Sequence, residues 1–117
     1  MLKNICVVSG SRAEYGLLQP VMTKIKQSKL INLQIIVTGM HLSPDFGHTI
    51  VDILADGFSV NKEVETLLSS NSARSITKAV GLGLIGFADA FQELKPDLVI
   101  LLGDRVEILP SAAAALI

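Results

Sequence analysis

The sequence lacks tryptophan and has one tyrosine, so it offers few aromatic side chains on which nucleic-acid bases could stack. It also lacks a run of lysine or arginine, and its formal net charge of −1 argues against nucleic acid or an anionic membrane as a partner. No stretch approaches the roughly 20 apolar residues of a membrane span, and the apolar segment at the amino terminus is too short for a signal peptide. We therefore expect a cytoplasmic protein with no membrane or nucleic-acid partner.

Cysteine and histidine are also scarce, with one cysteine and two histidines in the sequence. Cys6 is the single cysteine and cannot form an internal disulfide, and its place in an apolar run predicts a buried, reduced thiol. No histidine or cysteine pair has the spacing of metal ligands, so we expect no metal site. The sequence also contains no G-x-S-x-G nucleophile elbow and no Walker A motif.

What is present is an alternation of apolar runs and helical patterns in a chain of 117 residues, half of them hydrophobic, which suits at most one small domain. Hydrophobic spacing predicts strands over 3–8, 33–37, 58–61 (or an extended turn) and 98–102, and helices over 14–29, 43–55, 72–94 and 106–117. Pro20 falls inside the first helical pattern and predicts a kink there or a later start. This β-α order predicts an α/β fold with a Rossmann-like, three-layer parallel sheet and right-handed crossovers.

One glycine motif is misleading. Residues 81–86 match G-x-G-x-x-G literally, but the dinucleotide motif requires a preceding strand, and here the preceding residues continue a helix. We interpret these glycines as small residues that let a helix pack closely on the sheet.

The carboxyl-terminal helical pattern, 106–117, ends without a glycine, asparagine or lysine stop signal. We therefore expect the chain to be a fragment of a longer protein.

The segment 98–102 is five consecutive aliphatic residues, as expected for a strand buried on both faces of a parallel sheet. It is followed at once by Gly103, Asp104, Arg105 and, two residues later, Glu107. Charged residues at the carboxyl end of a buried strand lie where open α/β sheets bind ligands. A carboxylate beside an arginine there can act as a general base or bind substrate hydroxyls. Alternatively, Asp104 caps the last helix and Glu107 completes the capping pattern.

Two further residues follow the first two strands. Arg12 lies in a small-residue turn at a helix start, where it can bind a phosphate; the alternative is a surface pair with Glu14 or Asp104. His41 follows the second strand and shares the same sheet edge, although a lone loop histidine is commonly a solvated or capping residue.

Three segments together are more specific than any one of them. The segment 10–18 resembles the G-T/S-R-A-D/E-Y start of hydrolysing UDP-N-acetylglucosamine 2-epimerases of sialic-acid-type pathways. The segment 38–47 is similar to their second-strand loop, and 96–107 to their P-D-x-x-x-x-x-G-D-R-x-E/D segment. The three occur in the family's order along the whole chain.

The resemblance implies the amino-terminal half of a two-domain, GT-B-like fold with the active site between the domains. A complete member is roughly three times this length. The chain would therefore lack the second domain and be inactive by itself, and the whole protein would be a homo-oligomer, a dimer or a tetramer.

By the resemblance, the reaction converts UDP-GlcNAc and water to ManNAc and UDP, through C2 deprotonation, UDP elimination and rehydration with inversion at C2. Asp104 falls on the family's catalytic aspartate, and Arg12 and Arg105 on its nucleotide-contacting arginines. His41 and Glu107 complete the substrate- and nucleotide-binding residues that we expect. Gly16 stands where some relatives have serine. The chemistry requires no metal and no nicotinamide cofactor.

Three alternatives remain open. The first is a 2-epimerase of UDP- or GDP-linked diacetylbacillosamine in legionaminic-acid-type pathways, which shares the same motifs. The second is a non-catalytic module that binds nucleotide sugars or dimerises, and the third a glycosyltransferase of similar architecture.

Overall fold

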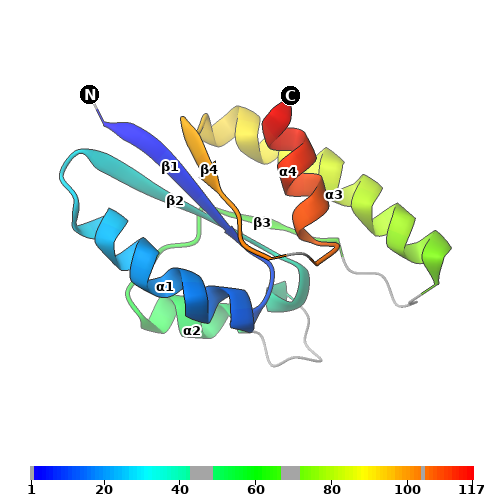
Figure 1. Cartoon of the computed structure of the whole chain (residues 1–117), viewed down its shortest axis with the longest axis horizontal. Helices are drawn as coiled ribbons and strands as arrows, with labels where there is room; N and C mark the ends of the chain where they lie inside the picture. Colours follow the sequence, from blue (N-terminus) through cyan, green and yellow to red (C-terminus); the bar gives the residue numbers. More distant parts are fainter. Residues whose placement is uncertain (1, 43–48, 67–71, 104) are drawn as a thin grey trace.

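In the computed structural model, which describes residues 2–42, 49–66, 72–103 and 105–117, a parallel sheet lies between two layers of helices (Figure 1). The elements are β1 (Lys3–Ser9), α1 (Arg12–Gln27), β2 (Ile31–Thr38), the 3-10 helix η1 (Gly39–Leu42), α2 (Ile50–Ala55), β3 (Lys62–Val64), α3 (Ala73–Leu94), β4 (Leu98–Ile100) and α4 (Ile108–Leu116). The predicted fold class, α/β with a three-layer Rossmann-like sheet, is confirmed.

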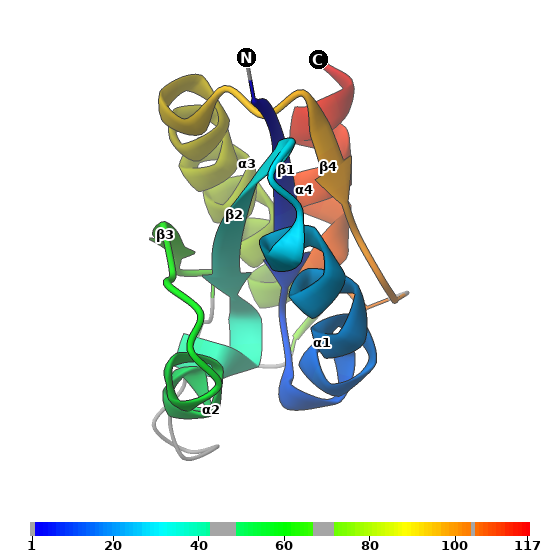
Figure 2. The same cartoon turned by 90° about the vertical axis from the view of Figure 1, so that its left-hand side faces the viewer.

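The strand order is β3-β2-β1-β4. Val7 of β1 pairs with Ile35 of β2 on one side and with Ile100 of β4 on the other. The chain thus builds outward from β1 to β3 and then returns across the sheet, through α3, to the opposite side of β1. Figure 2 shows the result, with α1 and α2 on one face and α3 and α4 on the other.

Alternation along the strands divides the core in two. Val7 and Val37 pack with residues of α1 and α2, whereas Cys6, Val8 and Ile36 pack with residues of α3. Each fully buried aliphatic side chain stabilises the fold by about 1.5–3 kcal/mol. The buried thiol predicted for Cys6 is confirmed, and burial raises its pKa to about 12.

The first helix, α1, begins two residues earlier than predicted and continues through Pro20. Proline removes the N–H that would bond to the carbonyl of Gly16 four residues before it. Gly16 is exposed, so water can satisfy that carbonyl and the helix need not break.

The prediction for α3 is accurate to within one residue, because its apolar face is long and periodic. Its N-cap, Ser72, accepts a hydrogen bond from the backbone N–H of Ser75. The interpretation of the glycines as packing residues holds for two of them: a Cβ on Gly83 would lie 2.6 Å from Pro110, and one on Gly86 2.6 Å from Val64.

Of the two options predicted for 58–61, the strand is wrong and the extended turn holds, because these residues form a connection without regular secondary structure. β3 is Lys62–Val64, and Phe58 instead anchors the preceding connection in the core, with its ring edge-on to Tyr15. β3 lacks the apolar run that signals a strand because it is an edge strand, where charged residues such as Lys62 and Glu63 tolerate exposure to water.

β4 is shorter and more exposed than predicted: it ends at Ile100, and Leu98 is 55% exposed. The physical reason is its position at the edge of the described sheet, with only β1 beside it. The two-faced pattern itself holds, because Val99 and Leu101 pack against one core cluster and Ile100 and Leu102 against the other.

The remaining helices differ at their starts. α4 begins at Ile108 rather than 106, a difference of the size expected for helix ends. α2 covers Ile50–Ala55, the carboxyl-terminal part of the predicted helix 43–55; its predicted N-cap, Ser43, lies outside the described residues.

Candidate functional site

The return of the chain across the sheet creates a switch point between β1 and β4. The connection from β1 leads to α1 on one face, and the segment after β4 leads to α4 on the other (Figure 2). Ligands of open α/β sheets bind where neighbouring connections diverge in this way. The predicted residues Arg12 and Arg105 follow these two strands.

The β1–α1 turn is held by hydrogen bonds to Glu14 and Ser11. Ser11 is the N-cap of α1, and its hydroxyl accepts a hydrogen bond of 3.3 Å from the backbone N–H of Glu14. The Glu14 carboxylate turns back and its Oε1 accepts a hydrogen bond of 2.8 Å from the N–H of Gly10. This reciprocal arrangement is a capping box shifted to the residue before the cap, and it fixes the course of the turn.

Glu14 is a residue that our sequence reasoning considered only as a partner for Arg12. It is 6% exposed, and a Cβ added to Gly103 would lie 2.8 Å from its Oε2. A carboxylate in the first turn of a helix is a common sequence feature, and only the fold brings it beside the end of the β4 segment. Its signal in the sequence is its spacing of four residues from Gly10.

The backbone segments that follow β1, β2 and β4 lie close to the side chains of Glu14 and Glu107. Gly39 and Gly103 have positive φ angles of 61° and 103°. A Cβ on Gly39 would lie 2.7 Å from Cγ of Glu107, and one on Gly10 would lie 3.3 Å from Cβ of the same residue. Glycine is therefore required at Gly39 and Gly103, and at Gly10 a Cβ would force Glu14 or Glu107 to shift by a few tenths of an ångström.

Arg12 is placed at this edge with its side chain 75% exposed. It forms an ion pair with Asp52 of α2, with 3.4 Å between Nε and Oδ2, rather than the pair with Glu14 that we considered. Exposed ion pairs contribute little stability, so the pair leaves the guanidinium available to an anionic ligand.

Arg105 and Glu107 lie together after β4. Nε of Arg105 and Oε2 of Glu107 are 3.1 Å apart, and Glu107 is half-buried against Gly10 and Gly39. Asp104, the predicted catalytic residue, lies outside the described residues. The alternative prediction, in which Asp104 caps the last helix and Glu107 completes the capping pattern, is wrong: the N-cap of α4 is Glu107 itself, and no described side chain makes a capping hydrogen bond there. Its neighbours Gly103 and Arg105 lie at the same edge of the sheet as Arg12.

His41 is fully buried. Its Nε2 lies 2.7 Å from the hydroxyl of Ser9 and its Nδ1 lies 2.7 Å from the hydroxyl of Thr49. Burial lowers the pKa of His41, opposed by a hydrogen bond with the Ser11 backbone and by the charge of Asp52. The structure gives it contacts that join β1 to α2, and its role in substrate binding stays a prediction.

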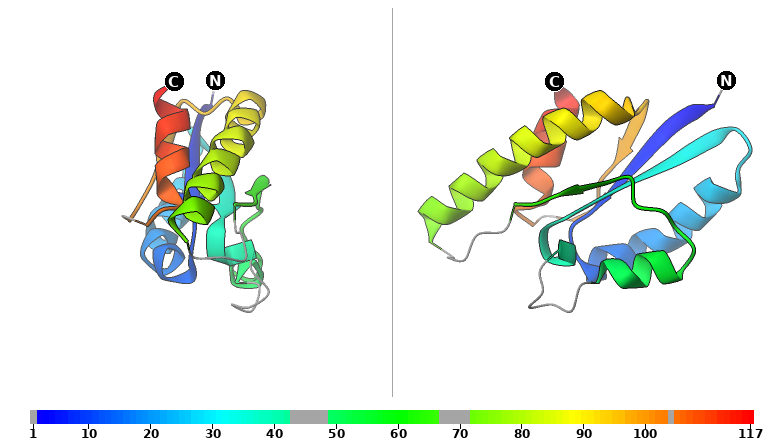
Figure 3. Two further views of the ribbon diagram at one scale, coloured as in Figure 1. Left: turned by 90° about the vertical axis from the view of Figure 1, so that its right-hand side faces the viewer. Right: turned by 180° about the vertical axis from the view of Figure 1, so that it is seen from behind.

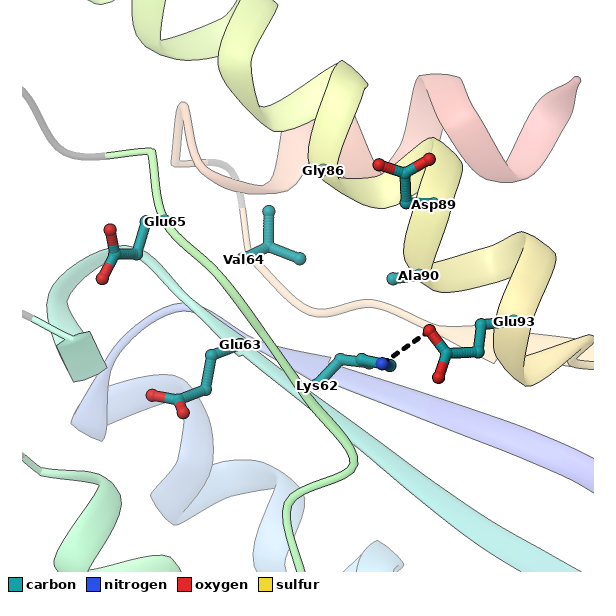
Figure 4. A pocket seen from close by; sticks show the side chains of 8 residues that line it. All are labelled: Lys62, Glu63, Val64, Glu65, Gly86, Asp89, Ala90 and Glu93. Carbon is teal, nitrogen blue, oxygen red and sulfur yellow. Dashed lines mark ion pairs between the residues drawn. The ribbon is translucent and has the colours of Figure 1, made fainter.

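A separate hollow of about 250 Å³ lies between β3 and α3 (Figure 4). It is lined by Lys62, Glu63, Val64, Glu65, Gly86, Asp89, Ala90 and Glu93. None of the predicted site residues lines it. In the described ranges, no group of three His, Cys, Asp or Glu side chains is arranged to hold a metal ion, and no described helix is long and apolar enough to cross a membrane.

Comparison with known proteins relates this chain to one family. A family model described as UDP-N-acetylglucosamine 2-epimerase matches residues 23–117. The hydrolysing UDP-N,N′-diacetylbacillosamine 2-epimerase of Legionella pneumophila is 43% identical over 99% of this chain and 31% of its own length. The hydrolysing GDP/UDP-N,N′-diacetylbacillosamine 2-epimerase of Campylobacter jejuni is 43% identical over 98% of this chain and 30% of its own.

Among solved structures, the UDP-GlcNAc 2-epimerase of Methanocaldococcus jannaschii in complex with UDP-GlcNAc and UDP superposes with a TM-score of 0.77 at 21% identity. The match covers 96% of this chain and 29% of that one. The chain thus spans about a third of the length of these relatives. The family match covers most of the chain, and the chain belongs to the UDP-N-acetylglucosamine 2-epimerase family.

Proposed function

We propose that the whole protein to which this chain contributes the amino-terminal domain is a hydrolysing 2-epimerase of UDP-N,N′-diacetylbacillosamine. The observation that carries the proposal is the 43% identity, across nearly the whole chain, to two relatives whose names give that substrate class. The substrate predicted from the motifs, UDP-GlcNAc, becomes the second candidate. It is favoured by the description of the family model and by the ligand of the solved relative.

Both substrates undergo the same chemistry. A base removes the proton from C2 of the sugar, the C1–O bond breaks, and UDP departs to leave a 2-acetamidoglucal. Water then adds across the double bond, with hydroxyl at C1 and a proton returned to the opposite face of C2. Because C2–H is a weak acid, the base must be held in place as the leaving group departs. The stabilisation of the diphosphate charge lowers the barrier further.

The residues at the sheet edge suit these requirements. We assign the base to Asp104 and the diphosphate contacts to Arg12 and Arg105, whose guanidinium groups can bind phosphate oxygens with two parallel hydrogen bonds. Both arginines are exposed at the ends of adjacent strands, where a nucleotide can reach them. Glu107 positions Arg105 through their ion pair.

We further propose that the 117 residues provide one wall of the site and that a second domain provides the other. The 117 residues alone are then expected to show no turnover, and the proposal is tested on the whole protein. Homo-oligomerisation of that protein is part of the same proposal.

The decisive experiment incubates the whole protein in deuterated water with UDP-N,N′-diacetylbacillosamine, its GDP-linked counterpart or UDP-GlcNAc, followed by proton NMR. We expect release of UDP and a C2-epimeric diacetamido sugar that carries deuterium at C2. Preferential turnover of UDP-GlcNAc to ManNAc would overturn the substrate assignment and keep the reaction. Inertness toward all three would overturn the enzymatic proposal in favour of a nucleotide-sugar-binding module.

A further inference from the structure

Glu14 is a buried carboxylate to which the proposed chemistry gives no role. Its side chain is 6% exposed, although it lies in the first turn of α1. Figure 3 shows the start of α1 and the segment after β4 at the same end of the sheet, away from the two chain termini. Burial of a carboxylate costs free energy unless other groups compensate it. A buried acid beneath an edge that is assigned to anion binding therefore has to contribute something that an apolar side chain would not.

The Glu14 side chain fills the space between two turns at this edge. On one side, its Oε1 accepts a hydrogen bond of 2.8 Å from the N–H of Gly10, in the β1–α1 turn. On the other side, its Oε2, Cδ and Cγ lie 2.8, 3.5 and 3.7 Å from the position that a Cβ on Gly103 would take. Gly103 follows β4 and has a φ angle of 103°. One side chain thus sets how closely the segment after β4 approaches the β1–α1 turn.

Other parts of this edge have anchors of their own. The cap of α1 uses the hydroxyl of Ser11 and the backbone N–H of Glu14, which any residue except proline would supply. Arg12 is the first residue of α1, and Arg105 is paired with Glu107 at 3.1 Å. What depends on the side chain of Glu14 is the approach of the segment that follows β4.

We propose, on the basis of the function proposed above, that Glu14 is a positioning residue for the deprotonation of C2. It holds Gly103 against the β1–α1 turn, and Asp104, to which we assign the base, is the next residue in the sequence. A base must lie within hydrogen-bond reach of the proton that it removes, and a misplacement of about 1 Å can reduce the rate about 100-fold. Glu14 should therefore affect turnover far more than nucleotide affinity.

The first test separates turnover from binding in the whole protein, with whichever of the three nucleotide sugars the parent turns over. Glu14→Ala removes the side chain and should lower kcat about tenfold or more, with the dissociation constant of UDP changed by less than about threefold. Glu14→Gln keeps the length and an oxygen for the N–H of Gly10, and should restore the larger part of kcat. Ile25→Val is the control for lost stability: it removes one buried methyl group at the other end of α1 and should leave kcat unchanged.

The second test needs no turnover and measures the contact itself with a double-mutant cycle, followed by urea unfolding. Gly103→Ala in the parent introduces both an unfavourable φ angle and a collision with Glu14. In the Glu14→Ala background the collision is absent and the φ strain remains, so Gly103→Ala should lower the unfolding midpoint less than it does in the parent. Gly57→Ala is the matched control, because Gly57 has a φ angle of 91° and a Cβ there meets only Lys26, at 3.6 Å. Its effect should be the same in both backgrounds.

The outcomes distinguish this proposal from the proposed function. In an active parent, additive effects of Gly103→Ala and Glu14→Ala would overturn the positioning role. So would a loss of kcat that Ile25→Val reproduces, or a loss of UDP affinity as large as the loss of kcat. Each of these results leaves the proposed function intact. A parent that is inert toward all three nucleotide sugars would overturn the proposed function and, with it, the role of Glu14 in proton transfer.

Discussion

Arg12 carries its charge on an exposed side chain at the carboxyl edge of the sheet, and its ion pair with Asp52 is a surface contact. We therefore expect Arg12→Ala to weaken UDP binding to the whole protein by about 1.5–3 kcal/mol, the value of a lost charge-assisted hydrogen bond. Isothermal titration calorimetry gives the dissociation constant. Asp52→Ala is the control, because it removes only the surface partner and should not weaken binding. An Arg12→Ala variant with unchanged affinity would remove Arg12 from the diphosphate site.

Asp104 is assigned a role in proton transfer, not in nucleotide binding. Asp104→Asn conserves shape and removes the base, so turnover and deuterium incorporation at C2 should be lost while UDP affinity is retained. Turnover is measured by NMR and affinity by calorimetry on the same sample. Retention of full activity would refute the assignment of Asp104 as the base.

His41 gives a prediction for the dependence of stability on pH. Because burial lowers its pKa in the folded state, the unfolded state takes up a proton first as the pH falls. The contribution of His41 to stability is therefore complete above about pH 6.5, the pKa of an exposed histidine, and decreases as the pH falls toward the folded-state value. The slope is at most about 1.4 kcal/mol per pH unit.

The measurement compares urea unfolding of the parent protein and of His41→Gln between about pH 8 and pH 5. Glutamine retains polar atoms near Ser9 and Thr49 but does not titrate. The stability difference between the two proteins should shrink as the pH falls. A difference that stays constant across this range would contradict the assignment of a neutral, buried histidine.

Helices and strands were predictable in proportion to their local signals. α3 has a long periodic face and a serine cap, so both of its ends followed from the sequence. β3 is three residues at a sheet edge, with no apolar run, and its position depends on pairing with β2 across 26 residues of chain. Local patterns do not contain that information, which is why the sequence leaves 58–61 open between a strand and an extended turn and does not indicate the strand at Lys62–Val64.

Some features of the candidate site were also predictable from the sequence, and others were not. The sequence order predicted that Arg12 and Arg105 would share one edge, because parallel strands end together. It did not predict the Arg12–Asp52 pair, the buried Glu14 carboxylate or the burial of His41, since each depends on contacts between elements that are distant in sequence.

The contact between α3 and α4 allows the packing of one helix against another to be tested by mutation. A Cβ on Gly83 would lie 2.6 Å from Pro110, so Gly83→Ala should destabilise the protein by about 1–3 kcal/mol, despite the better helix propensity of alanine. Gly16→Ala in α1 meets no atom within 4 Å and should be stabilising by about 0.5–1 kcal/mol. Urea unfolding of both variants measures the two effects. Equal effects would contradict close packing at Gly83.

For the molecule as a whole, the reactivity of Cys6 measures whether the helical layer separates from the sheet. It is fully buried between β1 and α3, and its raised pKa keeps it protonated and unreactive at neutral pH. We expect iodoacetamide to leave Cys6 unmodified in the native protein and to alkylate it in urea, at the same denaturant concentration at which helical circular dichroism is lost. Peptide mass spectrometry identifies the site. Alkylation that precedes the loss of helicity would show that the helical layer over Cys6 separates before the fold melts.

The convergence of Gly10, Gly39 and Gly103 on two carboxylates has a consequence for how this protein can be diversified. Two of these glycines have backbone angles that other residues rarely adopt, and all three leave no room for a Cβ without displacing Glu14 or Glu107. Saturation libraries at these positions should yield almost no folded, active clones. Selections for a new sugar preference should therefore vary residues around the site and keep these three glycines unchanged.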